Sequence, residues 1–193
     1  MLDQIELRGE FFDLLIQADK ETVRQVALGK CLACEGPLYR SDYRREPRGA
    51  LVAGAGEEMV IRFSLCCGRE GCRKRATPPS LRFLGRRVYL GAVVIVAAML
   101  AQALGAKEAR RATGVPTRTT NRWLGWWQNA FISTDVFMAV CARLVGVAVK
   151  DVPLAIVLRL GDTIEERVRR LLEWLRPLTT GSGIGSRLTR DVP

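Results

Sequence analysis

Apolar residues along this chain recur at helical spacing in several regions and lose that spacing in one. In the first region, Phe12, Leu15 and Ile16 fall on one side of a helix. Asp19 is a typical capping residue for a second helix, and Gly29 follows the last apolar position. The pattern therefore predicts two short helices within residues 1–29.

Residues 30–80 have no helical period and are rich in glycine and proline turn formers. Within them, residues 59–65 alternate between apolar and polar side chains, which predicts a strand. We expect a small β module here that is too rich in turns to build a large core of its own.

An almost continuous apolar stretch covers residues 88–101, interrupted by Gly91. It falls short of the roughly 20 residues that span a bilayer. We therefore predict a buried core helix and expect no membrane partner. Membrane insertion remains the alternative for this stretch.

The last third of the chain is again helical in pattern. Residues 107–131 predict two helices divided at Gly114, and residues 84–131 form one predicted unit. Residues 135–149 predict an apolar helix, and residues 163–177 an amphipathic one; we group both within residues 132–178. Residues 179–193 have the glycine and serine content of a flexible tail. The expected fold class is mainly α, with a small β module followed by a helical domain.

Five of the six cysteines lie in the β module, as C-x2-C from Cys31 to Cys34 and CC-x4-C from Cys66 to Cys72. Four thiolates from two such turns suit tetrahedral zinc, and the chain has no histidine to replace one. Neighbouring strand residues point to opposite faces, so only one of Cys66 and Cys67 faces the metal. We favour Cys67, with Cys66 as the alternative. Such a closed site predicts a structural Zn²⁺ in a zinc ribbon and no catalysis at the metal.

The distribution of charge indicates a class of partner. The formal net charge is +10, and residues 40–87 carry twelve bases against five acids. A surplus concentrated in this way favours nucleic acid as the partner. The residues of the β module that we expect to contact DNA are Arg44, Arg45, Arg73, Lys74 and Arg75.

A second basic segment has the pattern of a helix-turn-helix. Gly114 suits the tight turn after a first helix, and Val115 is placed to fill the angle between the two helices. The next helix begins near Pro116 and turns its tryptophans toward the core. Side chains on its other face would reach base edges in the major groove, and these are Thr117, Arg118, Asn121 and Arg122.

The run GVPTRTTNRWL from Gly114 to Leu124 resembles the GVSxxTLxRWL pattern of helix-turn-helix domains in bacterial insertion-sequence transposases. The cysteine turns, followed by RKRATPPSLRFL from Arg73 to Leu84, resemble the zinc ribbon that precedes such a domain. The resemblance covers roughly residues 31–127 and implies that both modules bind the terminal DNA of a mobile element. Transposases of this kind continue into an RNase H-like catalytic domain, and the residues after Trp127 are too few for that fold.

The sequence thus predicts a non-catalytic, zinc-stabilised protein that reads double-stranded DNA, acting as a homodimer or with a separately encoded recombinase. The first residues, MLDQIEL, lack the features of a secretory signal, which predicts a cytoplasmic location. Two alternatives are open. One is binding of RNA or single strands by the zinc ribbon through Tyr39 and Tyr43. The other is a membrane-associated scaffold.

Overall fold

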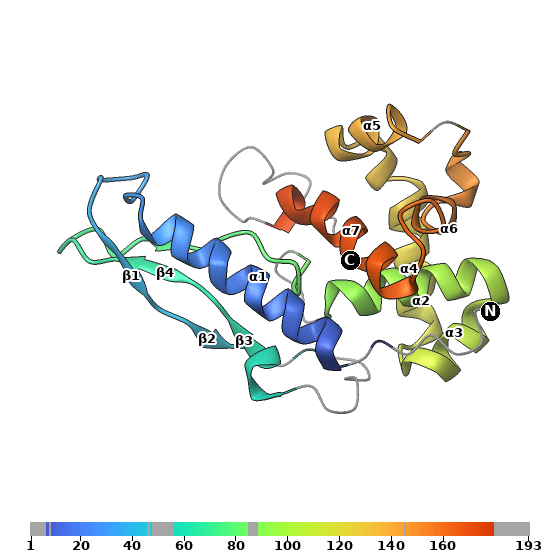
Figure 1. Ribbon diagram of the computed structural model, residues 1–193, viewed down its shortest axis with the longest axis horizontal. Helices are drawn as coiled ribbons and strands as arrows, with labels where there is room; N and C mark the ends of the chain where they lie inside the picture. The colour runs from blue at the N-terminus through green and yellow to red at the C-terminus, as the bar shows by residue number, and fades with distance from the viewer. Residues whose placement is uncertain are drawn as a thin grey trace.

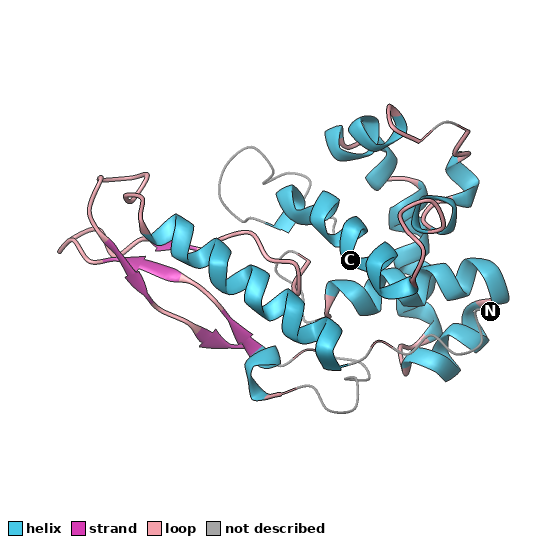
Figure 2. Cartoon of the chain, viewed as in Figure 1, coloured by secondary structure: helices cyan, strands magenta, loops and turns pink. Residues whose placement is uncertain are grey.

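The computed structural model describes residues 7, 9–45, 47, 56–84, 89–144 and 146–179. Within these residues, short antiparallel strands gather at one end of the long axis and a cluster of helices at the other (Figure 1). One long helix runs beside the strands (Figure 2). The mainly helical class with a small sheet agrees with the prediction from sequence.

The long helix is α1, Gly9–Ala27, and it is continuous where the sequence predicted two helices. Phe12, Leu15 and Ile16 are buried along it, as the helical spacing predicted. Asp19 caps nothing and lies buried in the middle of the helix. The capping prediction was wrong because the carboxylate of Asp19 bonds to residues far along the chain.

The strands form two small antiparallel sheets. β1 (Leu38–Arg40), β4 (Leu65–Cys67) and β5 (Arg75–Ala76) make one sheet with β4 in the centre. β2 (Tyr43–Arg44) and β3 (Ile61–Arg62) make the other. Residues 57–60 form a 3-10 helix, η1 (Glu57–Val60), so the single strand predicted over residues 59–65 is wrong in part.

Three helices form the centre of the helical cluster: α2 (Gly91–Leu104), α3 (Ala106–Thr113) and α4 (Thr117–Gln128). α2 is buried from Gly91 to Leu100, as its apolar run predicted. α7 packs against α2 so closely that a Cβ on Gly91 would lie 2.6 Å from Cδ2 of Leu172. Among the described residues, no helix is both long enough and apolar enough to cross a bilayer.

The C-terminal part consists of short elements. They are η2 (Phe131–Ser133), α5 (Asp135–Cys141), η3 (Val149–Asp151), α6 (Leu154–Val157), α7 (Ile164–Leu175) and η4 (Arg176–Thr179). The helix predicted over residues 135–149 therefore ends early, at Cys141. The chain turns there, and Gly146 has a φ of 77°, which a helix cannot continue through. The flexible tail was predicted over residues 179–193; Thr179 instead lies buried in η4, and residues 180–193 lie outside the described part.

Polar contacts join η4 to two earlier parts of the chain. The amide of Ser80 donates to Oγ1 of Thr179 at 2.9 Å, and Arg176 donates to Oγ1 of Thr22 at 2.7 Å. η4 is thereby held against both α1 and the segment that leads from the sheets toward α2.

Candidate metal centre and candidate nucleic-acid surfaces

The first cysteine turn joins α1 to β1. The amide of Cys31 donates to the carbonyl of Gly36 at 2.9 Å, and the amide of Glu35 donates back to Cys31 at 2.7 Å. Glu35 takes a φ of 59°, which closes the turn tightly. Space at Gly36 is also restricted, since a Cβ there would lie 3.0 Å from Sγ of Cys67. The local sequence thus brings Cys31 and Cys34 to one side of the turn.

The second turn connects β4 to β5. Gly71 at its tip has a φ of 77°, which favours glycine. The amide of Cys67 donates to the carbonyl of Lys74 at 2.9 Å and closes the loop. Arg69 reaches across from this turn and donates to the carbonyl of Cys34 at 2.8 Å, which joins the two turns.

The two turns bring four sulfurs together. The Sγ atoms of Cys31, Cys34, Cys67 and Cys72 all lie within 4.8 Å of one another. The Sγ atoms of Cys31 and Cys72 are 3.8 Å apart, and those of Cys34 and Cys67 are 3.4 Å apart. Sulfurs bound tetrahedrally to one zinc at about 2.3 Å would be about 3.8 Å apart. The group is compatible with a metal site.

Cys66, the alternative ligand considered from sequence, lies outside this group. Its Sγ is 3.3 Å from the carbonyl oxygen of Arg73, and its strand neighbours Leu65 and Cys67 are buried on the other face. The alternation of β4 therefore directs Cys67 toward the other three cysteines and Cys66 away from them.

The environment of the thiols differs from one to the next. The amide of Gly36 donates to the sulfur of Cys34 and lowers the pKa of this thiol to about 7. At Cys67 a hydrogen bond from the backbone amide of Arg69 also favours the thiolate. Burial and the neighbouring sulfurs outweigh this hydrogen bond and raise the pKa of the Cys67 thiol to about 12. The pKa of Cys72 is raised as well, since the amide of Lys74 is outweighed by Cys34 and burial. The raised pKa values mean that all four sulfurs can be thiolates together only when a cation lies among them.

The basic residues predicted for the β module are placed differently from one another. Arg44, Arg73 and Lys74 are exposed. Arg45 is half-buried with its guanidinium 5.6 Å from the ring centre of Phe83, and burial lowers its pKa. Arg75 is exposed, but its guanidinium is held in place because it donates to the carbonyl of Ser41 and to Oγ of Ser64.

The second predicted site lies on α3 and α4. Gly114 ends α3 in the left-handed conformation, with a φ of 69°, and Val115 is fully buried behind it. Ala109 is the small buried residue that packs α3 against its neighbours, while Arg110 next to it is exposed. Gly114 and Val115 indicated this turn in the sequence, whereas the role of Ala109 was not predicted from it.

α4 has one buried face and one polar face. Thr120, Trp123 and Trp127 are buried, and the ring of Trp123 packs edge-to-face on Tyr89 with centroids 4.7 Å apart. No side chain caps the first turn of α4. On the polar face, Thr117 is half-buried, and the exposed residues are Arg118, Asn121 and Arg122.

The structure does not bring the two predicted DNA-contact sets together. The strands that carry Arg44 and Arg75 lie at one end of the long axis, whereas α2, α3 and the helices around them lie at the other (Figure 1). The predicted DNA-contact residues are thus divided between two separate regions of the molecule.

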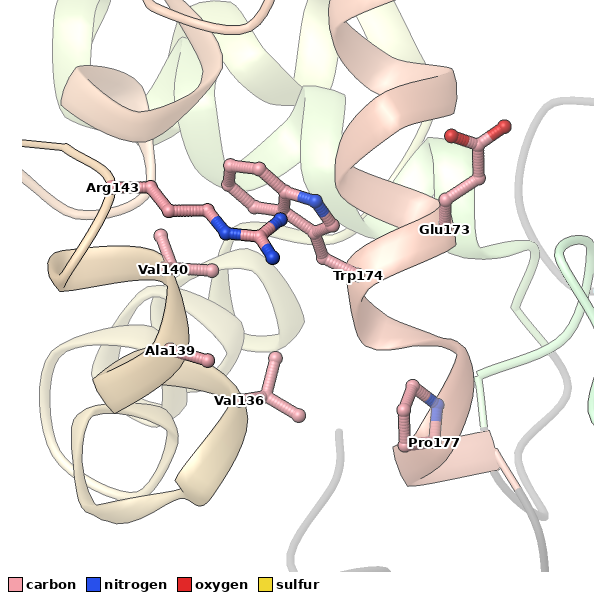
Figure 3. A pocket seen from close by; sticks show the side chains of 7 residues that line it. All are labelled: Val136, Ala139, Val140, Arg143, Glu173, Trp174 and Pro177. Carbon is pink, nitrogen blue, oxygen red and sulfur yellow. The ribbon is translucent and has the colours of Figure 1, made fainter.

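A pocket that no sequence motif marks lies between α5 and α7. It has a volume of about 280 Å³, and Figure 3 shows α5 side chains facing Trp174 and Pro177 across it. Its lining is mostly apolar, with one cation and one acid, and consists of Val136, Ala139, Val140, Arg143, Glu173, Trp174 and Pro177.

Comparison with known proteins gives no family assignment: no family model, no curated protein and no solved structure matches this chain.

Proposed function

We propose that this chain is a zinc-stabilised, non-catalytic DNA-binding protein related to transposases, which reads duplex DNA through a helix-turn-helix formed by α3 and α4. The observation that carries the proposal is the arrangement of α4. Its tryptophans anchor one face in the core, and the opposite face presents Arg118, Asn121 and Arg122 to solvent.

The chemistry of this face suits duplex DNA. An arginine can bond both acceptors of a guanine edge, and an asparagine can bond adenine in the same way. The uncapped first turn of α4 offers backbone N–H groups to a phosphate. The exposed basic residues Lys107 and Arg110 on α3 add positive charge beside it, whereas Arg111 is paired with Glu108.

The proposed metal is zinc, held by Cys31, Cys34, Cys67 and Cys72. Four soft thiolates at these distances match a tetrahedral structural site. Four protein ligands leave no coordination position for a substrate, which supports a role in folding rather than catalysis. The site would hold the ends of β1, β4 and β5 in place.

The test begins with selection of bound duplexes from a random pool, followed by fluorescence anisotropy on the selected sequence. Arg118→Ala and Arg122→Ala should each weaken binding by about 1–3 kcal/mol if the arginine reads a base. Arg159→Ala, in the exposed turn that follows α6, removes the same charge from a residue outside α4 and serves as the matched control. Unchanged binding by both α4 variants would exclude α4 as the reading helix.

Arg118→Lys and Arg122→Lys separate base reading from phosphate contact. A lysine keeps the charge but cannot make the bidentate bond to guanine. A base-reading arginine should therefore lose discrimination between sequences on this change, whereas a phosphate contact should lose little.

A further inference from the structure

The outer face of the three-stranded sheet carries an ordered row of side chains. Tyr39 pairs with Cys66 across β1 and β4, and Cys66 pairs with Arg75 across β4 and β5. Directly paired residues of antiparallel strands lie on the same face. The alternate residues Leu38, Leu65 and Cys67 are buried on the inner face. The row is therefore Tyr39, Cys66 and Arg75, facing away from the core.

Tyr39 is held in place but left uncovered. A Cβ built on Gly68 would fall 2.1 Å from Cε2 of Tyr39, so the ring rests directly on the glycine. The tyrosine is nevertheless 61% exposed. An aromatic ring fixed on one side and open to solvent on the other is a surface for stacking.

A second aromatic group extends the row. The guanidinium of Arg75 lies 5.1 Å from the ring centre of Tyr43, and bonds to the Ser41 carbonyl and to Oγ of Ser64 keep it there. Tyr43 is 37% exposed. The three-stranded sheet and the adjacent strand β2 thus present two tyrosines and a planar, immobilised guanidinium, all of which can stack on a nucleobase.

The charge beside the row is complementary to a phosphate backbone. Arg44, Arg73 and Lys74 are exposed, and none of them forms an ion pair with another described residue. The exposed acids of the cysteine turns are Glu35 and Glu70, and Asp42 is paired with Arg40. The basic residues outnumber the available acids, so the surface attracts a polyanion.

We propose that this outer face, with Tyr39 and Arg75, binds single-stranded DNA together with Tyr43 of the adjacent strand β2. These three side chains stack on unpaired bases, and Arg44, Arg73 and Lys74 contact phosphates. Bases paired in a duplex do not offer their faces to side chains, so the surface selects unpaired strands. It lies at the opposite end of the molecule from α2 and α3, against which α4 packs (Figure 1). It is therefore separate from the duplex contact proposed for α4. The two surfaces together would bind a duplex and an adjoining or separate single strand.

The first experiment measures binding of the full-length protein to fluorescein-labelled oligo(dT) and to a labelled duplex. Tyr39→Leu and Tyr43→Leu should each weaken oligo(dT) binding roughly five- to a hundred-fold. Tyr39→Phe keeps the ring and should bind as the parent does, and duplex binding should not change in any of the three. Equal oligo(dT) binding by the parent and both leucine variants would overturn the proposal.

The proposal of duplex binding through α4 and that of single-strand binding on the sheet can be overturned independently. Arg118→Ala should weaken duplex binding and leave oligo(dT) binding intact, which is the reverse of the tyrosine variants. Loss of both kinds of binding in each variant would instead indicate one shared surface and would overturn the assignment to the sheet. Tighter binding of oligo(U) than of oligo(dU), which differ only in the 2′-hydroxyl, would overturn the assignment to DNA, because it would show recognition of that hydroxyl.

A measurement on the unaltered protein guards against variants that fail to fold. Oligo(dT) carrying 5-iododeoxyuridine forms a covalent bond on irradiation with an aromatic side chain stacked on the modified base. We expect the cross-linked peptides, identified by mass spectrometry, to contain Tyr39 or Tyr43. Cross-links confined to α4 or to other parts of the chain would overturn the proposal.

Discussion

Arg82 donates from its Nε to Oδ2 of Asp19 at 2.8 Å, and both side chains are buried. Oδ1 of the same carboxylate accepts the amide of Leu81 at 2.7 Å. The terminal nitrogens of Arg82 donate to the carbonyls of Glu58 and Ile61, at 2.6 and 2.9 Å. One ion pair therefore joins α1 to η1, to β3 and to the segment that leads toward α2.

Asp19→Asn should be strongly destabilising. It removes the charge that compensates Arg82 in a buried setting, and breaking a buried pair in this way costs about 3–5 kcal/mol. Asp13→Asn makes the same chemical change on an exposed position of the same helix and should cost little. Urea denaturation of both variants measures the difference. Equal stability of the two variants would show that the ion pair contributes no more than a surface charge.

The proposed metal ligands predict which cysteines are needed for metal binding. Cys34→Ser should lower the zinc content of the purified protein and its thermal stability, because the site loses one of four soft ligands. Cys66→Ser changes a cysteine of the same module that lies outside the group and should retain zinc. Elemental analysis with a thermal melt distinguishes them, and metal loss in the second variant would assign Cys66 to the site.

Zinc affinity should increase with pH. At pH 7, the Cys67 thiol, with a pKa of about 12, and the Cys72 thiol, with a raised pKa, are protonated before metal binds, while Cys34, with a pKa of about 7, is partly ionised. Zinc binds thiolates, so each protonated ligand releases a proton, and every proton released makes the affinity change about tenfold per pH unit. Competition with a chelator at pH 6.5 and 7.5 measures this. An affinity independent of pH would mean that thiols are not the ligands.

Local sequence signals predicted the parts of the fold that depend on neighbours in the chain. Gly114 and Val115 marked the turn between α3 and α4, and the apolar run after Gly91 marked a buried helix. The two cysteine turns could be recognised for the same reason. Each of these features is determined within a few residues, by helical period, by a positive φ or by ligand spacing.

Features that depend on distant contacts were not predictable in this way. Asp19 resembled a capping residue because its partner, Arg82, lies 63 positions away. Nor did the sequence indicate how the basic residues of the β module and those of α4 lie relative to one another, because no local pattern encodes the distance between them. The outward row on the sheet needed the strand register, which pairs Tyr39 with Cys66 across a gap in the sequence.

Two glycines provide a final prediction about the metal centre. A Cβ at Gly36 would lie 2.9 Å from Cβ of Arg69 and 3.0 Å from Sγ of Cys67, which is too close for either to remain in place. Gly36→Ala should therefore displace a ligand sulfur and weaken zinc retention against a chelator. A Cβ built on Gly125, inside α4, would have no atom within 4 Å of it. Gly125→Ala should therefore retain zinc and stabilise the helix by about 1 kcal/mol. Equal zinc retention by the two variants would show that the first cysteine turn tolerates a side chain between the sulfurs. The close approach of Gly36 to the sulfur of Cys67 would then not be needed for metal binding.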